Sequence, residues 1–467
     1  MRWPEPRRLQ PLRMQRVALV APRTALPDVL LRAGRAGCLD LDVVTAATTG
    51  NGQDAAGATA PNGQDAAGAT APDQVAAANA PQLGDVLAAA TGPESVGAVL
   101  GWLPAQRLPE LNAALAPLGG AAVPLAAPPG QVPPTLLAAG SPGRSFDLLV
   151  QTYSTVPYAD LDPTLVSGLA YAVMFGVMFG DAGHGLLLFG LALLLRAGRL
   201  PLARSARIRR AWPFLAGGGV VSVLTGLLYG EAFGPTGVVP VLWLDPLQEP
   251  VRLLVAAVAA GAVLLAGAYG IGVANRVREG GWGYAIYAPS GVAGALLFLG
   301  LGCVAAGAVL SVGWLVAIGA VLAPAALGLA YVGLFAASTG GAAGAVQAGV
   351  ELFDLVVRLG SNVVSFARLA AFGLTHAALT TLVWQATTGL WGRGALSALA
   401  VLVFAVGNLL TLGLETVVAG IQALRLEYYE LFSRIFTTAG RPFRVWRLPP
   451  EPDPDQAGSR APSEESR

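Results

Sequence analysis

The chain has 467 residues, of which 54% are hydrophobic and only 12% are charged. This composition excludes an ordinary soluble protein and is typical of a protein that crosses a membrane several times. The formal net charge of +1 identifies no class of partner, because the charges are unevenly placed along the chain.

All 29 basic residues are arginine, which we attribute to a GC-rich, bacterial genome. A Walker A loop requires a lysine, so the sequence contains no ordinary P-loop for ATP. His184 and His376 both lie in apolar segments, and Cys38 and Cys303 are far apart. Two histidines cannot close a zinc site without help from carboxylates. We therefore expect no metal, no cofactor and no nucleic-acid partner.

Residues 1–164 are expected to form a small cytoplasmic α+β domain. Residues 16–20 predict a strand and residues 27–36 a helix; structure resumes near 95–102, and residues 104–118 have a helical apolar period.

A low-complexity segment interrupts this domain at about residues 45–92. It contains an 11-residue sequence, 51–61, that recurs identically at 62–72. The segment is rich in Gly, Ala, Pro and Thr and has almost no large apolar side chains, so it cannot bury a core. We predict a flexible linker.

Eight apolar runs follow from residue 165. They cover residues 165–180, 183–196, 211–230, 251–275, 290–312, 314–336, 346–387 and 395–437. The first two have only roughly 15 residues, against the ~20 needed to cross the hydrocarbon of a bilayer. They are either one long interrupted helix or two half-length helices that meet at the polar segment 180–185.

The distribution of arginine decides between these alternatives. Six arginines lie in the 196–210 loop and four in residues 434–447, whereas the 231–250 loop has none. Eight separate spans place every Arg-rich segment and both termini in the cytoplasm, as the positive-inside rule requires. We predict an all-α polytopic membrane domain over 165–446, with about eight transmembrane helices of which the last two are long and tilted. A disordered cytoplasmic tail over 447–467 follows.

Arg368 lies in the seventh apolar run, where its charge is permanent. Insertion scales put the cost of Arg at the centre of a membrane helix at roughly 2.5–3.5 kcal/mol. Snorkelling to the membrane surface is one explanation. A stripe of polar residues at helical spacing favours function instead; it comprises Glu351, Asp354, Arg358, Ser361, Ser365, Arg368 and Thr375.

The eighth run has a second polar stripe with the same spacing, made of Asn408, Thr411, Glu415, Gln422 and Arg425. Either the two stripes face each other or they line a shared aqueous or protein-lined path. An alternative places the charges at the ends, Glu351, Arg358, Arg425 and Glu427, at the membrane surface.

Three further polar residues leave two interpretations open. His376, one position off the first stripe, is either a satisfied polar residue or a proton relay. Asp181 and His184 are three residues apart, as in a helix cap or a structural pair, or they give protons access to the membrane interior.

Several motifs resemble those of the membrane-embedded a subunit of V-type and A-type rotary ATPases, called subunit I in prokaryotes. The strongest is VMFGVMFGDAGHG at 173–185, preceded by PYADLDPT at 157–164. GLLYGEAFG at 226–234 follows, and then the arginine-bearing segments 365–376 and 414–430. Residues 14–41 and GWLP at 101–104 resemble the soluble domain more weakly. Family members carry a long coiled-coil excursion where this chain has its linker, so the resemblance implies a shortened N-terminal domain.

The resemblance implies a non-catalytic stator subunit. It would form proton half-channels against the proteolipid (c/K) ring and couple proton translocation to ATP hydrolysis or synthesis, in a complex with peripheral-stalk and central-stalk subunits in the cell membrane. Arg368 takes the place of the essential arginine, Arg425 that of its partner, and Glu415 that of an acidic residue lining a half-channel. Gln422 departs from the His of some members. We expect the proton path to include also Ser365, His376, Asp181 and His184.

A secondary ion transporter or channel is the alternative function. Transporters of this kind usually contain inverted repeats with paired broken helices, and the sequence has one break, at 180–185. A degraded, purely structural homologue is disfavoured by the polar stripes on both long helices.

Overall fold

The computed structural model describes residues 11–42, 86–128, 131–137, 146, 150, 155–199, 205, 209, 211–394, 396–436 and 440–446. The chain divides into two compact units: residues 11–137 with 441–467, and residues 138–440 with 1–10. The tandem repeat, most of the predicted linker and the predicted tail at 447–467 lie outside the described residues.

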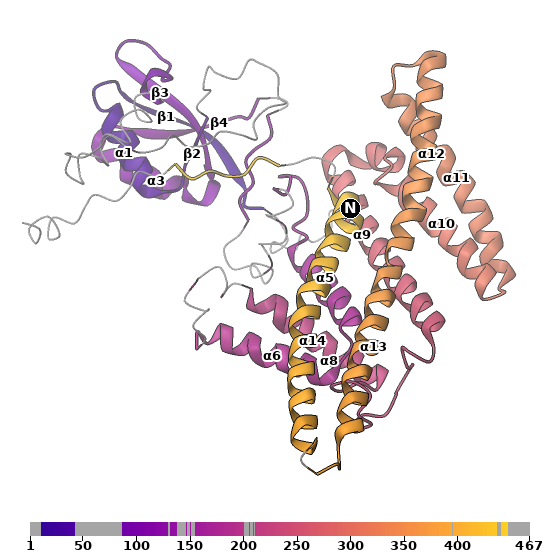
Figure 1. Ribbon diagram of the computed structural model, residues 1–467. Helices are drawn as coiled ribbons and strands as arrows, with labels where there is room; N and C mark the ends of the chain where they lie inside the picture. The colour runs from indigo at the N-terminus through magenta and orange to yellow at the C-terminus, as the bar shows by residue number, and fades with distance from the viewer. Residues whose placement is uncertain are drawn as a thin grey trace, which may run out of the picture. The chain divides into compact units, whose positions relative to one another are not determined.

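The smaller unit contains a four-stranded antiparallel sheet in the order β2-β3-β1-β4 (Figure 1). Its elements are β1 Met14–Pro22, α1 Leu26–Ala36, β2 Asp40–Leu41, β3 Val96–Pro104, α3 Leu108–Leu115 and β4 Ala121–Leu125. Short 3-10 turns flank α3 at Ala105–Arg107 and Ala116–Leu118. The predicted strand at 16–20, the helix at 27–36 and helical structure within 104–118 are confirmed, whereas β2 and β4 were not predicted.

The boundaries of this unit differ from those predicted. Val86, inside the predicted linker, is buried and its apolar side chain packs in the core of this unit. Residues 441–446 also belong to this unit: Arg441 donates to Asp42 at 2.8 Å and Trp446 packs against the same core. The segment 155–163 belongs instead with the membrane helices, where Asn275 accepts a hydrogen bond from the backbone N–H of Leu161.

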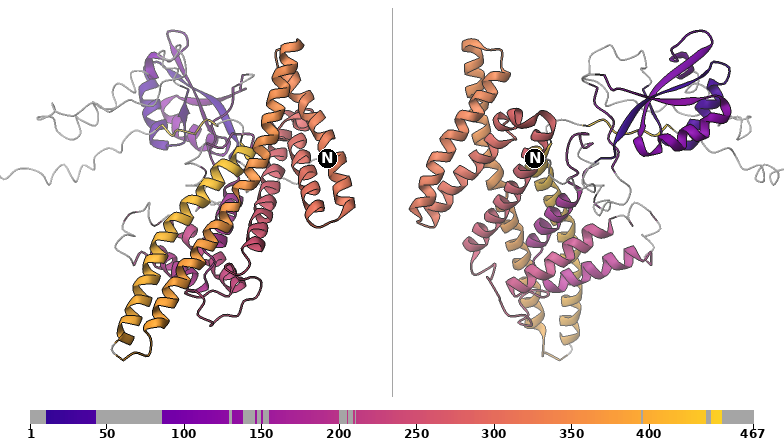
Figure 2. Two further views of the ribbon diagram at one scale, coloured as in Figure 1. Left: turned by 45° about the vertical axis from the view of Figure 1, so that its right-hand side comes forward. Right: turned by 180° about the vertical axis from the view of Figure 1, so that it is seen from behind.

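The larger unit is helical (Figures 1 and 2). Its helices are α5 Thr164–Met178, α6 Ala182–Arg196, α8 Trp212–Tyr229, α9 Pro250–Tyr287, α10 Val292–Val309, α11 Gly313–Ala337, α12 Gly341–Ser365, α13 Ala367–Leu390, α14 Leu396–Leu426, the π-helical segment η5 Glu427–Phe432 and α15 Ser433–Ile435.

Six helical stretches among the described residues are long and apolar enough to cross a membrane. One of them joins α12 to α13, which are separated by a single turn at Phe366, and another runs from Leu396 to Ile435. Helices α5 and α6 have 15 residues each. The chain is therefore a multi-pass membrane protein. That α5 and α6 also cross, to give eight spans, stays a prediction.

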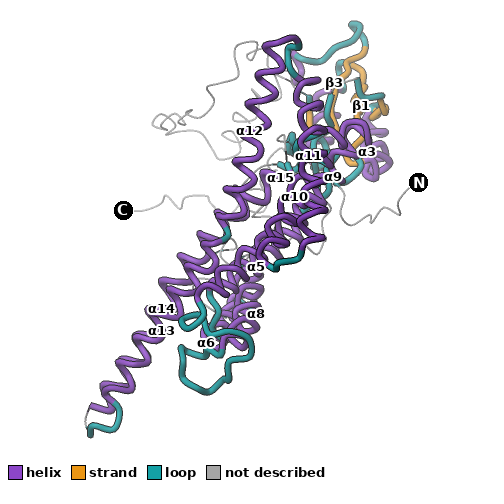
Figure 3. Tube along the Cα trace, turned by 90° about the vertical axis from the view of Figure 1, so that its right-hand side faces the viewer, coloured by secondary structure: helices purple, strands orange, loops and turns teal. Residues whose placement is uncertain are grey.

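The long helices α13 and α14 lie side by side, antiparallel (Figures 1 and 3). With 31 residues, α14 is roughly 46 Å long at the rise of an α-helix, well beyond the ~30 Å thickness of bilayer hydrocarbon. Polar residues along α14 can therefore lie at several depths in the membrane.

Helices α6 and α8 also lie side by side, and glycines allow their close approach. A Cβ atom on Gly185 would lie 2.9 Å from the carbonyl oxygen of Gly219, and one on Gly219 would lie 2.9 Å from that of Gly185. Small residues at a crossing are the usual means by which membrane helices pack backbone against backbone. The glycines of the 180–185 motif therefore have a packing role.

Candidate functional site

The polar break between α5 and α6 is organised by Asp181. Its side chain caps α6 by accepting from the backbone N–H of His184 at 2.8 Å. The same carboxylate accepts from the N–H groups of Phe233 at 3.0 Å and Gly234 at 2.9 Å. Asp181 is fully buried. Its hydrogen bond to the N–H of His184 confirms the helix cap predicted as one alternative, and the same carboxylate anchors the loop after α8.

That loop adopts an unusual backbone conformation. Phe233 has φ 54° and Gly234 has φ 88°, both in the left-handed region, which a bulky residue such as Phe rarely adopts. The Asp181 carboxylate holds both N–H groups in this conformation. The loop carbonyl of Glu231 in turn accepts from the N–H of Ala182, the first residue of α6, at 2.9 Å.

Two hydroxyl groups of α8 satisfy the carbonyl groups left free where α5 ends. Thr225 donates to the carbonyl of Gly176 at 2.7 Å, and Ser222 donates to the carbonyl of Phe179 at 2.5 Å. Broken helices are tolerated in a membrane only where neighbouring groups replace the lost backbone hydrogen bonds. The break is therefore a built feature of the fold.

Four of the predicted site residues meet beside this break. Nδ1 of His376 on α13 is hydrogen-bonded to the carboxylate of Glu415 on α14, and its Nε2 lies 3.9 Å from the Asp181 carboxylate. Nδ1 of His184 lies 3.5 Å from the same carboxylate. We call Asp181, His184, His376 and Glu415 the histidine cluster. All four are buried.

The histidine cluster keeps unused hydrogen-bonding capacity. Both ring nitrogens of His184, Nε2 of His376 and Oε1 of Glu415 have no hydrogen-bond partner among the described residues. A cavity of about 210 Å³ adjoins the cluster and is lined by His376, Glu415 and Thr375 together with apolar side chains. Groups that exchange protons need such free donor and acceptor positions.

The other three predicted site residues lie in a second group. Arg368 is half-buried in the first turn of α13, near Arg425 and the carboxylate of Glu430. Its Nη1 atom is buried without a hydrogen-bond partner among the described residues. The hydroxyl of Ser365 donates to the carbonyl of Ser361 at 3.0 Å. Arg425 is exposed at the end of α14.

A small polar network that the sequence did not predict supports this second group. With its amide oriented to satisfy both of its atoms, Asn362 donates to Glu430 at 2.9 Å and accepts from Arg434 at 2.8 Å. Glu430 thereby lies among three arginine side chains, those of Arg368, Arg425 and Arg434. The spacing of Glu427 and Glu430 in the sequence gave no indication of which carboxylate turns toward α12.

The two groups are separated along the membrane helices. Arg368 and His376 are eight residues apart on α13, a rise of roughly 12 Å. Each lies opposite a different carboxylate, Glu430 for Arg368 and Glu415 for His376. Polar residues thus occur at two depths along the membrane helices. Arg368 lies at one depth and His376 at the other.

The two polar stripes do not face each other along their length. Asn408, Thr411 and Glu415 of α14 are buried, whereas Ser361 and Thr375 of the seventh run are exposed. Ser361 and Thr375 thus lie on the exposed side of α12 and α13, whereas the buried His376 of α13 is hydrogen-bonded to Glu415 of α14.

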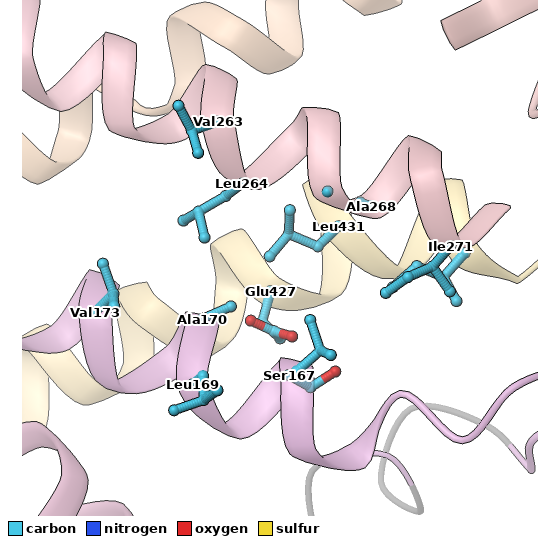
Figure 4. Close-up of a pocket in the computed structure, with 13 residues that line it drawn as sticks. Ser167, Leu169, Ala170, Val173, Val263, Leu264, Ala268, Ile271, Glu427 and Leu431 are labelled. Carbon is cyan, nitrogen blue, oxygen red and sulfur yellow. The ribbon is translucent and has the colours of Figure 1, made fainter. Parts of the chain in front are cut away.

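One alternative from the sequence places four charged residues at the membrane surface. Glu427 differs from the other three in its burial. Glu351, Arg358 and Arg425 are exposed, but Glu427 is fully buried. It lines a cavity of about 180 Å³ between α5, α9 and η5, and its carboxyl group points toward α5 beside Ser167 (Figure 4). Glu427 begins the π-helical turn Glu427–Phe432 and, four residues after the buried Ala423, continues the buried face of α14.

A buried carboxyl group, that of Asp160, lies outside the spanning segments, where residues 155–163 meet α9. Asp160 is fully buried. Burial raises its pKa to about 7; the neighbouring Glu279 carboxyl also raises it, while Arg276 and Arg278 act in the opposite direction. Arg278 donates to the carbonyl of Ala159 at 2.8 Å. This contact holds the segment before α5 against α9.

The chain has relatives among known proteins. A family described as the V-type ATPase 116 kDa subunit family matches residues 91–238. An A-type ATP synthase subunit I of Aeropyrum pernix is 27% identical over 64% of this chain and 49% of its own length. A protein of the same name from Halobacterium salinarum is 28% identical over 67% of this chain and 51% of its own.

A human relative, V-type proton ATPase 116 kDa subunit a 3, is 33% identical over 30% of this chain and 19% of its own length. The chain thus spans about half the length of the A-type relatives and less of the human one. These matches identify the chain as a relative of the V-type ATPase 116 kDa subunit family and of the A-type ATP synthase subunits I.

Proposed function

We propose that this chain is the stator membrane subunit of a rotary ATPase. It forms two proton half-channels against a ring of proteolipid subunits and is not itself catalytic. In this proposal both termini lie in the cytoplasm of a cell whose plasma membrane holds the complex, and the remaining partners are the peripheral-stalk and central-stalk subunits.

The proposal rests mainly on the charge and the position of Arg368. Its charge is permanent, and its buried Nη1 atom has no partner among the described residues. The stripe beside it, with Ser361 and Thr375, is exposed on the surface of this chain. A carboxylate on another subunit would complete this arrangement, and the fixed guanidinium would favour its ionised form.

The two depths of polar residues support two half-channels. The histidine cluster would connect the ring to one side of the membrane, with His376 and Glu415 exchanging protons. The group around Glu430 would connect the ring to the other side. Arg368 would separate them, because a guanidinium does not give up a proton and so does not relay one.

Disulfide cross-linking tests which surface contacts the ring. The two native cysteines are first replaced, Cys38→Ser and Cys303→Ser, and one cysteine is introduced near the carboxyl group of the proteolipid encoded in the same genome. Val364→Cys is 67% exposed on the face of Ser361 and Arg368, and Val321→Cys on α11 is the matched control at 70%. We expect an oxidant to link Val364→Cys, and not Val321→Cys, to the proteolipid. Linking of the control alone, or of neither, would contradict the proposal.

A further inference from the structure

The chain contains only two histidines, and the fold brings them together from different helices. The rings of His184 on α6 and His376 on α13 have centroids 5.6 Å apart. One ligand atom from each, with a carboxylate oxygen of Asp181, form a set that lies within 4.8 Å of one another. The sequence alone excluded a zinc site for want of carboxylates; the structure supplies Asp181 and, behind His376, Glu415.

His376 has the orientation of a metal ligand. The Glu415 carboxylate holds the Nδ1 atom of its ring, so the other nitrogen, Nε2, is directed at Asp181 and has no hydrogen-bond partner among the described residues. Metal-binding histidines almost always have one ring nitrogen held by a carboxylate, a carbonyl or water, which fixes the ring and strengthens the other nitrogen as a ligand. Glu415 occupies that supporting position.

Asp181 and His184 are also prepared for a ligand. Three backbone N–H groups fix the Asp181 carboxylate, which leaves about one of its four lone-pair positions free. His184 is 0% exposed, yet neither of its ring nitrogens has a hydrogen-bond partner among the described residues. A buried imidazole that makes no good hydrogen bond is costly, even with its Nδ1 atom 3.5 Å from the Asp181 carboxylate, and a bound cation that accepts its lone pair would offset this cost.

We propose that His184, His376 and Asp181 bind one divalent transition-metal ion of the zinc type, with Glu415 supporting His376. In a tetrahedral zinc site the ligand atoms lie roughly 3.4 Å apart, so the most separated of these atoms, within 4.8 Å of one another, need to close by about 1.4 Å at most. Two nitrogen ligands favour zinc, copper or nickel over sodium, calcium or magnesium, which prefer oxygen. Three protein ligands leave a fourth position for water.

Binding requires no other subunit, so this proposal is tested separately from the rotary function. The full-length chain is purified in detergent without a histidine tag, stripped with a chelator and titrated with ZnCl₂ by calorimetry. We expect about one zinc ion per chain. The affinity falls about 10–100-fold in Glu415→Gln, as for other supporting residues, and binding is lost in His184→Ala. The variant Cys38→Ser/Cys303→Ser is the control and retains binding.

Two measurements guard against a misfolded variant. Zinc raises the unfolding temperature of the parent chain and of the cysteine control but leaves that of His184→Ala unchanged. Cobalt in the unmodified chain gives the intense visible absorption of a tetrahedral site with nitrogen ligands. Loss of binding in the cysteine control, equal binding by His184→Ala, or an octahedral cobalt spectrum would each overturn the proposal.

Discussion

The imidazole of His376 and the carboxylate of Glu415 form a buried hydrogen-bonded pair that joins α13 to α14. The two residues are 39 positions apart in the sequence, and each lies on the inner face of its helix. Because the two side chains are hydrogen-bonded to each other, their contributions to stability should be coupled.

A double-mutant cycle measures this coupling. We expect His376→Ala and Glu415→Ala to destabilise the chain less when combined than the sum of the two single effects, with an interaction of about 0.5–3 kcal/mol in denaturant unfolding. The exposed pair Gln347 and Glu351, linked at 2.9 Å, is the control, with a coupling below about 0.5 kcal/mol. Additive effects at 376 and 415 would show that the pair does not form.

The crossing of α6 and α8 should not tolerate a methyl group. Gly185→Ala and Gly219→Ala each push a Cβ atom against the opposite backbone, and overpacking of this kind costs about 1–3 kcal/mol. Gly190→Ala on α6 is the matched control, because a Cβ there meets nothing within 4 Å, and it should be neutral or slightly stabilising. Thermal unfolding in detergent checks the difference; equal effects at 185 and 190 would contradict the close approach.

Glu427 and Glu430 should respond in opposite ways to the same replacement. Neither carboxyl oxygen of Glu427 has a hydrogen-bond partner of good geometry among the described residues, whereas Glu430 accepts from Asn362 and lies near three arginines. Glu427→Met removes a buried polar group and fills an apolar cavity, so we expect a higher unfolding temperature. Glu430→Met leaves positive charges uncompensated and should lower it. Destabilisation by Glu427→Met would mean that its carboxyl group has a partner.

Asp160 should make the stability of the chain fall as the pH rises. Its carboxyl pKa is raised from 3.8 to about 7 by burial first and by Glu279 second, so between about pH 4 and 7 the folded state holds a proton that the unfolded state has lost. The free energy of unfolding therefore decreases with increasing pH across this window. Asp160→Asn should flatten the dependence, as followed by thermal unfolding between pH 4 and 8. An unchanged slope in this variant would assign the effect to other groups.

Much of the fold could be predicted from the sequence. Strand β1, helix α1 and the apolar helices have clear periodicities, and the break before Asp181 follows from its polar residues and glycines. The boundaries near 137 and 440 could not be predicted, because they depend on long-range contacts such as those of Arg441 with Asp42 and of Leu161 with Asn275.

The site could be predicted only in part. The sequence shows polar residues in apolar helices, but it does not show that they divide into two groups. The stripe on the seventh run predicts a polar face that ends at Thr375, whereas the structure buries the adjacent His376. Glu430 and Asn362 could not be predicted because they come from distant parts of the sequence, the turn at 427–432 and helix α12, and meet only in the folded chain.

Proton transport by the assembled complex tests the central claim most directly. ATP-driven acidification of proteoliposomes is compared for complexes carrying Arg368→Lys, Arg368→Ala and the control Arg358→Ala, whose exposed side chain pairs with Asp354. We predict that both changes at 368 abolish transport with the complex still assembled, because a lysine in a dry site can lose its proton, and that the control transports normally. Near-normal transport by Arg368→Lys or Arg368→Ala would contradict the account.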